Sequence, residues 1–244
     1  MAPDGPTDAR DPGTPGASAV APAGTAALVV YSDPRCPWAH VAVRRLLASA
    51  ERQGVESELC VDHRWFPLDD EAMPTDGEAL DRKLEPIRSL EPDATWHRWT
   101  GASGSFPASS RLAAAWVQGA KRSSAAASMG LDRALREALF DDGRDISDES
   151  VVIEVAGGVD EVDVDLVGRE VASGRPDEEL ERHAELARSE LVPASPTIVL
   201  TDGSTWTNPG IEFSSDDGVP TIDRDDPTVH DDIVEAFLAL RHYD

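Results

Sequence analysis

The sequence predicts an α/β fold in which a βαβ unit and a ββα unit are separated by a large all-helical insertion. Two strand patterns flank one amphipathic helix in residues 27–65, and strand patterns return at residue 196 before a final helix. The residues between these parts show helical periodicity, broken by segments rich in Gly, Pro and Asp. Residues 26–70 and 191–244 are therefore predicted to form one α/β domain, and residues 71–190 the insertion.

The first predicted strand is the apolar run Ala27–Tyr31, which is rich in β-branched residues and precedes the turn sequence Ser-Asp-Pro. Pro37 then suits the first turn of a helix, where a backbone N–H would have no partner in any case. Cys36 is thus expected at a strand-to-helix junction, directly before the helix begins. Gly54 marks the end of this helix, whose apolar face consists of Val41, Val43, Leu46 and Leu47.

The second predicted strand, Val55–Trp65, alternates apolar and polar residues, as a half-buried strand does. It completes the βαβ unit, and its alternation favours a position at the edge of the sheet. The insertion that follows is expected to contain helices with apolar residues at helical spacing: Gly77–Leu90, Ala108–Gln118, Ser124–Phe140, Val162–Ser173 and Asp177–Leu191.

Strand patterns return with Pro196–Leu200, and Asp202-Gly203 predicts a tight hairpin turn into Thr205–Thr207. A polar loop is expected next. Asp226-Pro227 then predicts an N-cap followed by proline in the first turn of a final amphipathic helix. Without the insertion, the order βαβ–ββα is that of the thioredoxin fold.

Composition excludes several classes of protein. The chain carries 22 basic and 47 acidic residues, a formal charge of −25, which repels nucleic acid and anionic lipid, so neither is expected as a partner. No apolar stretch approaches the roughly 20 residues that a membrane helix needs. The first 25 residues are rich in Pro, Gly, Ala and Asp and lack the pattern of a signal peptide, which predicts a disordered tail on a cytoplasmic protein.

Three segments carry a resemblance to a known family. They are Asp33–Trp38 (DPRCPW), Trp65–Leu68 (WFPL) and Ser195–Leu200 (SPTIVL), the last followed by Asp-Gly and Asn-Pro-Gly turns. These segments resemble the DsbA-like branch of the thioredoxin superfamily, in particular proteins related to FrnE and to 2-hydroxychromene-2-carboxylate isomerase. The resemblance implies a thioredoxin-like fold split by a helical insertion.

The same resemblance implies roles for individual residues. Cys36 occupies the position of the nucleophile, and Pro196 that of a cis-proline whose preceding residue, Ser195, faces the thiol. Pro37, Trp38, Ser195 and Pro196 are then expected to line a substrate groove beside Cys36. Because a thiol at a helix N-terminus faces unpaired N–H groups and the positive end of the helix dipole, we expect its pKa to be lowered.

Two further residues are candidates for supporting the thiolate. Arg35 adjoins Cys36 in the sequence and would add positive charge. His40 lies about one helical turn after Cys36 and is a candidate base or ion-pair partner, with a packed histidine as the alternative interpretation. The six histidines show no spacing typical of metal ligands, so no metal site is predicted.

Ala39 departs from the family pattern. Disulfide-exchanging members of the family carry a second cysteine there, which attacks a mixed disulfide and releases the product. Alanine cannot do this, so the adduct on Cys36 would wait for an external thiol. The other cysteine, Cys60, is predicted within a strand and is not expected to pair with Cys36, because a disulfide needs Cα atoms within about 7 Å.

These observations favour a thiol-disulfide oxidoreductase-like protein that acts through the single thiol of Cys36, with a low-molecular-weight thiol as cosubstrate and no tightly bound cofactor. Its partner would be a protein disulfide, or a small thiol or electrophile. Two alternatives stay open. One is a glutathione-type thiol-dependent isomerase or transferase, of the 2-hydroxychromene-2-carboxylate isomerase or kappa type; the other is a non-catalytic module that binds an extended peptide.

Overall fold

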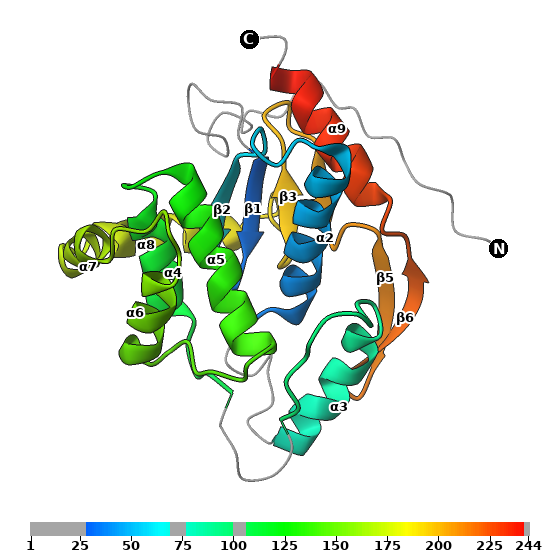
Figure 1. Cartoon of the computed structure of the whole chain (residues 1–244). Helices are drawn as coiled ribbons and strands as arrows, with labels where there is room; N and C mark the ends of the chain where they lie inside the picture. Colours follow the sequence, from blue (N-terminus) through cyan, green and yellow to red (C-terminus); the bar gives the residue numbers. More distant parts are fainter. Residues whose placement is uncertain (1–27, 69–76, 100–105, 242–244) are drawn as a thin grey trace.

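The computed structural model describes residues 28–68, 77–99 and 106–241, so the predicted tail 1–25 lies outside the described residues. A four-stranded sheet in the order β2-β1-β3-β4 forms the centre of the molecule (Figure 1). β1 and β2 are parallel, whereas β3 is antiparallel to both β1 and β4. The α/β fold and the edge position of the second strand are as predicted. The strands are β1 (Leu28–Ser32), β2 (Val61–Trp65), β3 (Thr197–Val199) and β4 (Thr205–Thr207).

Two helices of the α/β part, α2 (Pro37–Gln53) and α9 (Val229–Arg241), pack against each other and cover one face of this sheet (Figure 1). As predicted, α2 begins at Pro37 and ends at Gly54, which has a left-handed φ of 68° and donates its N–H to the last turn. The core between sheet and helices is apolar and includes Leu28, Val30, Leu46, Ile198, Ile233 and Phe237.

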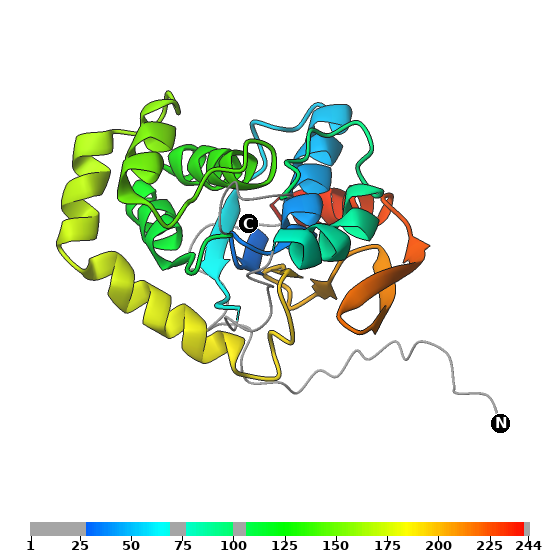
Figure 2. The same ribbon diagram turned by 90° about the horizontal axis from the view of Figure 1, so that it is seen from below.

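The insertion between β2 and β3 is helical throughout its described elements. Most of its helices pack beside the β2 edge of the sheet, while α3 contacts α2 on the other side of the molecule (Figures 1 and 2). α6 is not among the predicted helices, because its apolar residues are spread around most of the helix and no single stripe stands out. The helices are α3 (Gly77–Arg88), α4 (Arg111–Ala120), α5 (Ala125–Phe140), α6 (Glu149–Gly157), α7 (Val164–Ala172) and α8 (Arg175–Ala187).

A β-hairpin replaces the predicted polar loop before the last helix. Its strands, β5 (Ile211–Asp216) and β6 (Val219–Asp225), pair with each other, and β6 packs against α3. The turn between them uses Asp217 and Gly218, both with positive φ (48° and 75°), as a tight hairpin requires. The prediction of a loop was wrong because most of the hairpin is exposed, so its polar residues hide the strand pattern.

Several predicted boundaries also change: the helix predicted over Asp177–Leu191 spans Arg175–Ala187, and the one predicted over Ala108–Gln118 spans Arg111–Ala120. β2 begins at Val61 instead of Val55, because the N–H groups of Val55 and Leu59 close turns onto Ala50 and Val55 after the end of α2. The final helix begins at Val229, two residues after Pro227. No helix in the described ranges combines the length and apolar character needed to cross a membrane.

Candidate functional site

The pairing of β1 with β3 brings Cys36 and Ser195 together across 159 residues of sequence. The two strands are antiparallel, with Tyr31 opposite Thr197, so the end of β1 and the start of β3 lie at the same edge of the sheet. Cys36 follows the turn after β1, and its Sγ lies 3.3 Å from the carbonyl oxygen of Ser195. The Ser195–Pro196 peptide bond is cis, as the resemblance predicts.

Asp33 joins the two sides of this site. Its backbone N–H donates to Ser195 Oγ at 3.0 Å, on the strand β3 side. Its buried carboxylate accepts from the N–H of Arg35 at 2.7 Å and from the N–H of Leu68 at 2.9 Å. The predicted motif residue Leu68, which follows β2, is therefore fixed against the turn that carries Cys36.

Arg35 links the Cys36 turn to the insertion. Its guanidinium donates to the carbonyl oxygens of Ala108 at 2.8 Å and Leu68 at 3.1 Å, and it lies 3.4 Å from the Asp33 carboxylate. The side chain is almost fully buried, so each of these bonds is shielded from water. These contacts hold the Cys36 turn against the segments that carry Leu68 and Ala108.

Burial controls the protonation of Cys36. The residue is only 2 % exposed, and this desolvation raises the pKa of its thiol, because a thiolate is poorly stabilised away from water. A hydrogen bond from the Ser195 side chain opposes the effect most, followed by the N–H of Ala39 and the charge of Arg136, while the Asp33 carboxylate adds to it. The expectation that the helix N-terminus lowers the pKa of Cys36 is therefore wrong: in this environment, burial outweighs the favourable N–H groups.

Trp38 forms the outer side of the site. It is half-buried, and its ring stacks on Phe213 of the β5–β6 hairpin with centroids 4.3 Å apart and planes 13° apart. Pro37 is buried at the start of α2, and Pro196 accepts the N–H of Asn208 at 3.1 Å through its carbonyl oxygen. Pro37 and Trp38 directly follow Cys36, and Pro196 follows the Ser195 that faces its sulfur, but the thiol itself is closed to solvent.

His40 lies in an aromatic cluster. Its ring is 4.8 Å from that of Phe140 and 5.1 Å from that of Trp96, centroid to centroid. Its Nε2 is 3.4 Å from a carboxylate oxygen of Asp141. Burial lowers the pKa of the imidazole, so the ring is neutral at pH 7 and its surroundings are those of a packed histidine.

Cys60 lies at the opposite end of the sheet from Cys36. Its carbonyl oxygen accepts the N–H of Leu28, the first residue of β1, whereas Cys36 follows the last residue of that strand. Five strand residues at about 3.3 Å each therefore separate the two ends. Both cysteines are free thiols, in agreement with the expectation that they do not pair.

Sequence reasoning missed two basic residues beside the thiol. Lys83 of α3 interacts electrostatically with Cys36, which opposes the lowering of the Lys83 pKa by burial. Arg136 of α5 lowers the pKa of Cys36 by its charge. Both residues belong to the insertion, and no local motif connects them with a cysteine far earlier in the sequence. The sequence offers one weak indication, for Arg136: it lies four residues after Asp132 in a predicted helix, a spacing at which the two side chains can form an ion pair.

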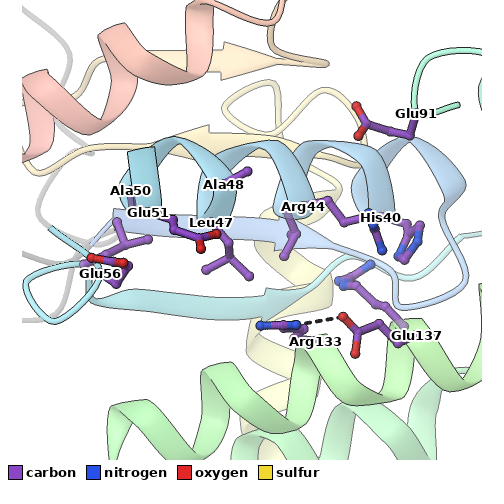
Figure 3. A pocket seen from close by; sticks show the side chains of 13 residues that line it. His40, Arg44, Leu47, Ala48, Ala50, Glu51, Glu56, Glu91, Arg133 and Glu137 are labelled. Atoms are coloured by element: carbon purple, nitrogen blue, oxygen red, sulfur yellow. Dashed lines mark hydrogen bonds and ion pairs between the residues drawn. The ribbon is translucent and has the colours of Figure 1, made fainter. Parts of the chain in front are cut away.

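A pocket of about 480 Å³ lies between α2 and α5, next to but not at the thiol (Figure 3). His40 lines one end of it, and Glu51 and Glu56 line the other. Arg133 and Glu137 of α5 form an ion pair at 2.8 Å along one side. Within the described ranges, no group of three or more His, Cys, Asp or Glu side chains is placed to hold a metal ion.

Several solved structures have a similar fold. No curated protein matches the chain. Cytosolic disulfide reductase DsbM from Pseudomonas aeruginosa superposes with a TM-score of 0.57 at 18% identity, covering 88% of this chain and 99% of DsbM. A structure of DsbM with GSH gives 0.58 at 16% identity, covering 87% and 99%. 2-Hydroxychromene-2-carboxylate isomerase gives 0.51 at 18% identity, covering 73% and 87%.

At these identities the structural likeness shows the fold, which is thioredoxin-like with a helical insertion. A sequence model of a protein family also matches this chain directly. The model is described as DSBA-like thioredoxin domain, and it matches residues 27–217, which is most of the 244 residues. The chain belongs to the DSBA-like thioredoxin domain family.

Proposed function

We propose that this chain is a monothiol oxidoreductase in which Cys36 is the only nucleophilic sulfur and a low-molecular-weight thiol completes each turnover. The observation that carries the proposal is the position of Cys36 Sγ, 3.3 Å from the Ser195 carbonyl oxygen at the shared edge of β1 and β3. The family match supplies the class of chemistry, which is thiol-disulfide exchange.

The positions of the other candidate sulfur sites support a single-thiol mechanism. Ala39, where a resolving cysteine would lie, is fully buried on the first turn of α2 and offers its N–H to the Cys36 sulfur. Cys60 is at the far end of β1 and is out of reach of an adduct on Cys36. The thiol that resolves the adduct must therefore come from outside the described part of the chain.

Each turnover balances as two exchanges. The Cys36 thiolate attacks one sulfur of a disulfide R–S–S–R′, so that a Cys36–S–S–R bond forms, the S–S bond of the substrate breaks, and R′–S⁻ leaves with the electron pair. A second thiolate, R″–S⁻, then attacks the R sulfur, forms R–S–S–R″ and restores the Cys36 thiolate. Both steps need a thiolate, and burial raises the pKa of Cys36, so we expect the rate to rise with pH above neutrality.

The structural neighbours favour neither a protein nor a small molecule as the partner of Cys36. One neighbour is a cytosolic disulfide reductase and was also solved with GSH, and another is an isomerase. A GSH-like thiol as cosubstrate, and a reducing, cytoplasmic setting in which both cysteines stay free, are parts of this proposal. The isomerase or transferase alternative shares the thiol cosubstrate but requires no disulfide.

The test is a disulfide-exchange assay with hydroxyethyl disulfide as substrate and glutathione as the external thiol, run from pH 7 to 10. The Cys60→Ser variant is the matched control, because it removes the second sulfur at the far end of the sheet. We expect Cys36→Ser to reduce exchange to the rate of glutathione and hydroxyethyl disulfide without protein, and Cys60→Ser to keep the wild-type rate above that background. The catalysed part of the wild-type rate should increase through this pH range. Equal activity in wild type and Cys36→Ser would contradict the proposal.

Two other outcomes would replace it with the alternatives. If wild type exchanges no disulfide but isomerises a small aromatic substrate in a glutathione-dependent reaction that Cys36→Ser abolishes, the chain is an isomerase of the hydroxychromene type. If neither reaction occurs and an extended peptide binds wild type and Cys36→Ser equally well, the chain is a binding module.

A further inference from the structure

Asp132 and Arg136 of α5 form a buried ion pair that the reaction above does not use. Arg136 Nε lies 2.8 Å from Asp132 Oδ2, and Nη2 lies 3.2 Å from Oδ1. Both side chains are at most 3 % exposed. Removing two charges from water is costly, so the further contacts of such a pair are informative about its role.

The guanidinium of Arg136 reaches the turn that carries Cys36. Its Nη2 donates to Ser32 Oγ at 2.7 Å, and its Nη1 donates to the carbonyl oxygen of Asp33 at 3.1 Å. The same carbonyl oxygen accepts the N–H of Cys36 at 2.9 Å. The carbonyl group of Asp33 thus connects the guanidinium of Arg136 with the backbone of Cys36. Arg136 and Cys36 are both buried.

We propose that Arg136 is a positioning residue for Cys36, which holds the Ser32–Asp33 turn from the insertion and supplies the positive charge that stabilises the Cys36 thiolate. The inference rests on the proposed function, because it assumes that the thiolate is the reacting species. It assigns the insertion a chemical role, since α5 belongs to the insertion and Cys36 to the α/β part.

Other charged groups also act on this region. The Asp33 carboxylate disfavours the thiolate, and Lys83 on α3 interacts with it favourably. Asp132 offsets part of the Arg136 charge, and the imidazoles of His63 and His40 are neutral near pH 7 because burial lowers their pKa. Removing one charge at a time from α5 separates the contribution of Arg136 from these.

The experiment measures the rate of iodoacetamide alkylation of Cys36 against pH, in a Cys60→Ser background so that one thiol is read. Arg136→Met removes the buried charge. Arg133→Met is the matched control, because it removes the same group from the same helix, at a position where the side chain is 61 % exposed. Asp132→Asn removes the negative charge of the pair and keeps its shape, and circular dichroism confirms that each variant is folded.

We expect Arg136→Met to raise the pH midpoint of alkylation by about one unit, so that the rate at pH 8 falls about tenfold. Arg133→Met should keep the midpoint of the parent, and Asp132→Asn should lower it. These opposite shifts are a signature that a merely structural role of the pair would not produce. Arg136→Lys, which keeps the charge, should have a midpoint close to that of the parent.

An unchanged midpoint in Arg136→Met would overturn the inference. If that variant does not fold, an unchanged or raised midpoint in Asp132→Asn overturns it instead. The readout is independent of turnover: shifted midpoints without disulfide exchange in wild type would refute the proposed function alone, whereas exchange with unshifted midpoints would refute the role of Arg136 alone.

Discussion

At the scale of single residues, the site depends on hydrogen bonds that hold Cys36 in a closed environment. Ser195 contributes twice, because its carbonyl oxygen faces the Cys36 sulfur and its hydroxyl accepts the N–H of Asp33. Asp33 in turn fixes Arg35 and Leu68. The thiol in this environment is buried, and burial raises its pKa, so the protonated form is favoured at neutral pH.

Replacing Ser195 tests this network. Ser195→Ala leaves the buried N–H of Asp33 without its partner, and we expect the free energy of unfolding to fall by about 1–3 kcal/mol. Urea denaturation measures this change. Ser123→Ala is the control, because the buried hydroxyl of Ser123 has no hydrogen-bond partner among the described residues, so its loss should be close to neutral. Equal losses in the two variants would contradict the role given to Ser195.

At the scale of elements, the β5–β6 hairpin is the part of the fold that encloses the outer side of the site. It follows β4 and precedes α9 in the chain, and its strand β6 packs on α3 (Figure 2). Its Phe213 stacks on the ring of Trp38. Phe213 remains 37 % exposed, so the stacked pair is half open to solvent. The hairpin thereby joins the insertion to the first turn of α2.

Removing the stack should loosen this junction. We expect Phe213→Ala to lower the free energy of unfolding by about 1–2 kcal/mol, from the lost aromatic pair and its buried area. Val219→Ala is the matched control, because Val219 is on the same hairpin and is similarly exposed, at 38 %, without a ring partner. Thermal unfolding measures the loss of stability in each variant relative to wild type. Equal losses in Phe213→Ala and Val219→Ala would show that the ring stack does not stabilise the fold.

The predictability of these elements differs for physical reasons. The βαβ unit and Cys36 at the start of α2 were predictable, since buried strands, Pro37 and Gly54 leave strong local signals. The hairpin and α6 were not, because one is mostly exposed and the other is apolar around most of its surface. The direction of the Cys36 pKa shift also required the structure, because burial depends on contacts from distant parts of the chain.

At the scale of the whole molecule, buried histidines make stability depend on pH. Burial lowers the pKa of His183 to about 3 and that of His230 to about 4, below the ordinary value of 6.5. The unfolded chain therefore binds protons that the folded chain excludes once the pH falls below about 6.5. The stabilisation from the neutral imidazoles is complete above that pH and is lost progressively towards pH 4.

We expect the free energy of unfolding to decrease between pH 6.5 and pH 4, with each of the two histidines contributing on the order of 3 kcal/mol at pH 4. Paired carboxylates such as Asp62 and Asp132, whose pKa values are lowered, protonate only at more acidic pH. Urea unfolding across this range measures the decrease. In His230→Gln the slope should be smaller, and a slope identical to wild type would contradict the assignment to His230.

The central claim is that Cys36 is a single thiol whose adduct needs an external thiol. The most direct measurement is the lifetime of that adduct by intact mass, after a Cys60→Ser protein is treated with glutathione disulfide and desalted. We expect one glutathione on Cys36 that persists until a thiol is added. In Ala39→Cys, which places a second sulfur three residues away on α2, the glutathione should be lost without added thiol as an internal disulfide forms. Loss of the glutathione from the parent as fast as from Ala39→Cys would show that Cys36 does not depend on an external thiol.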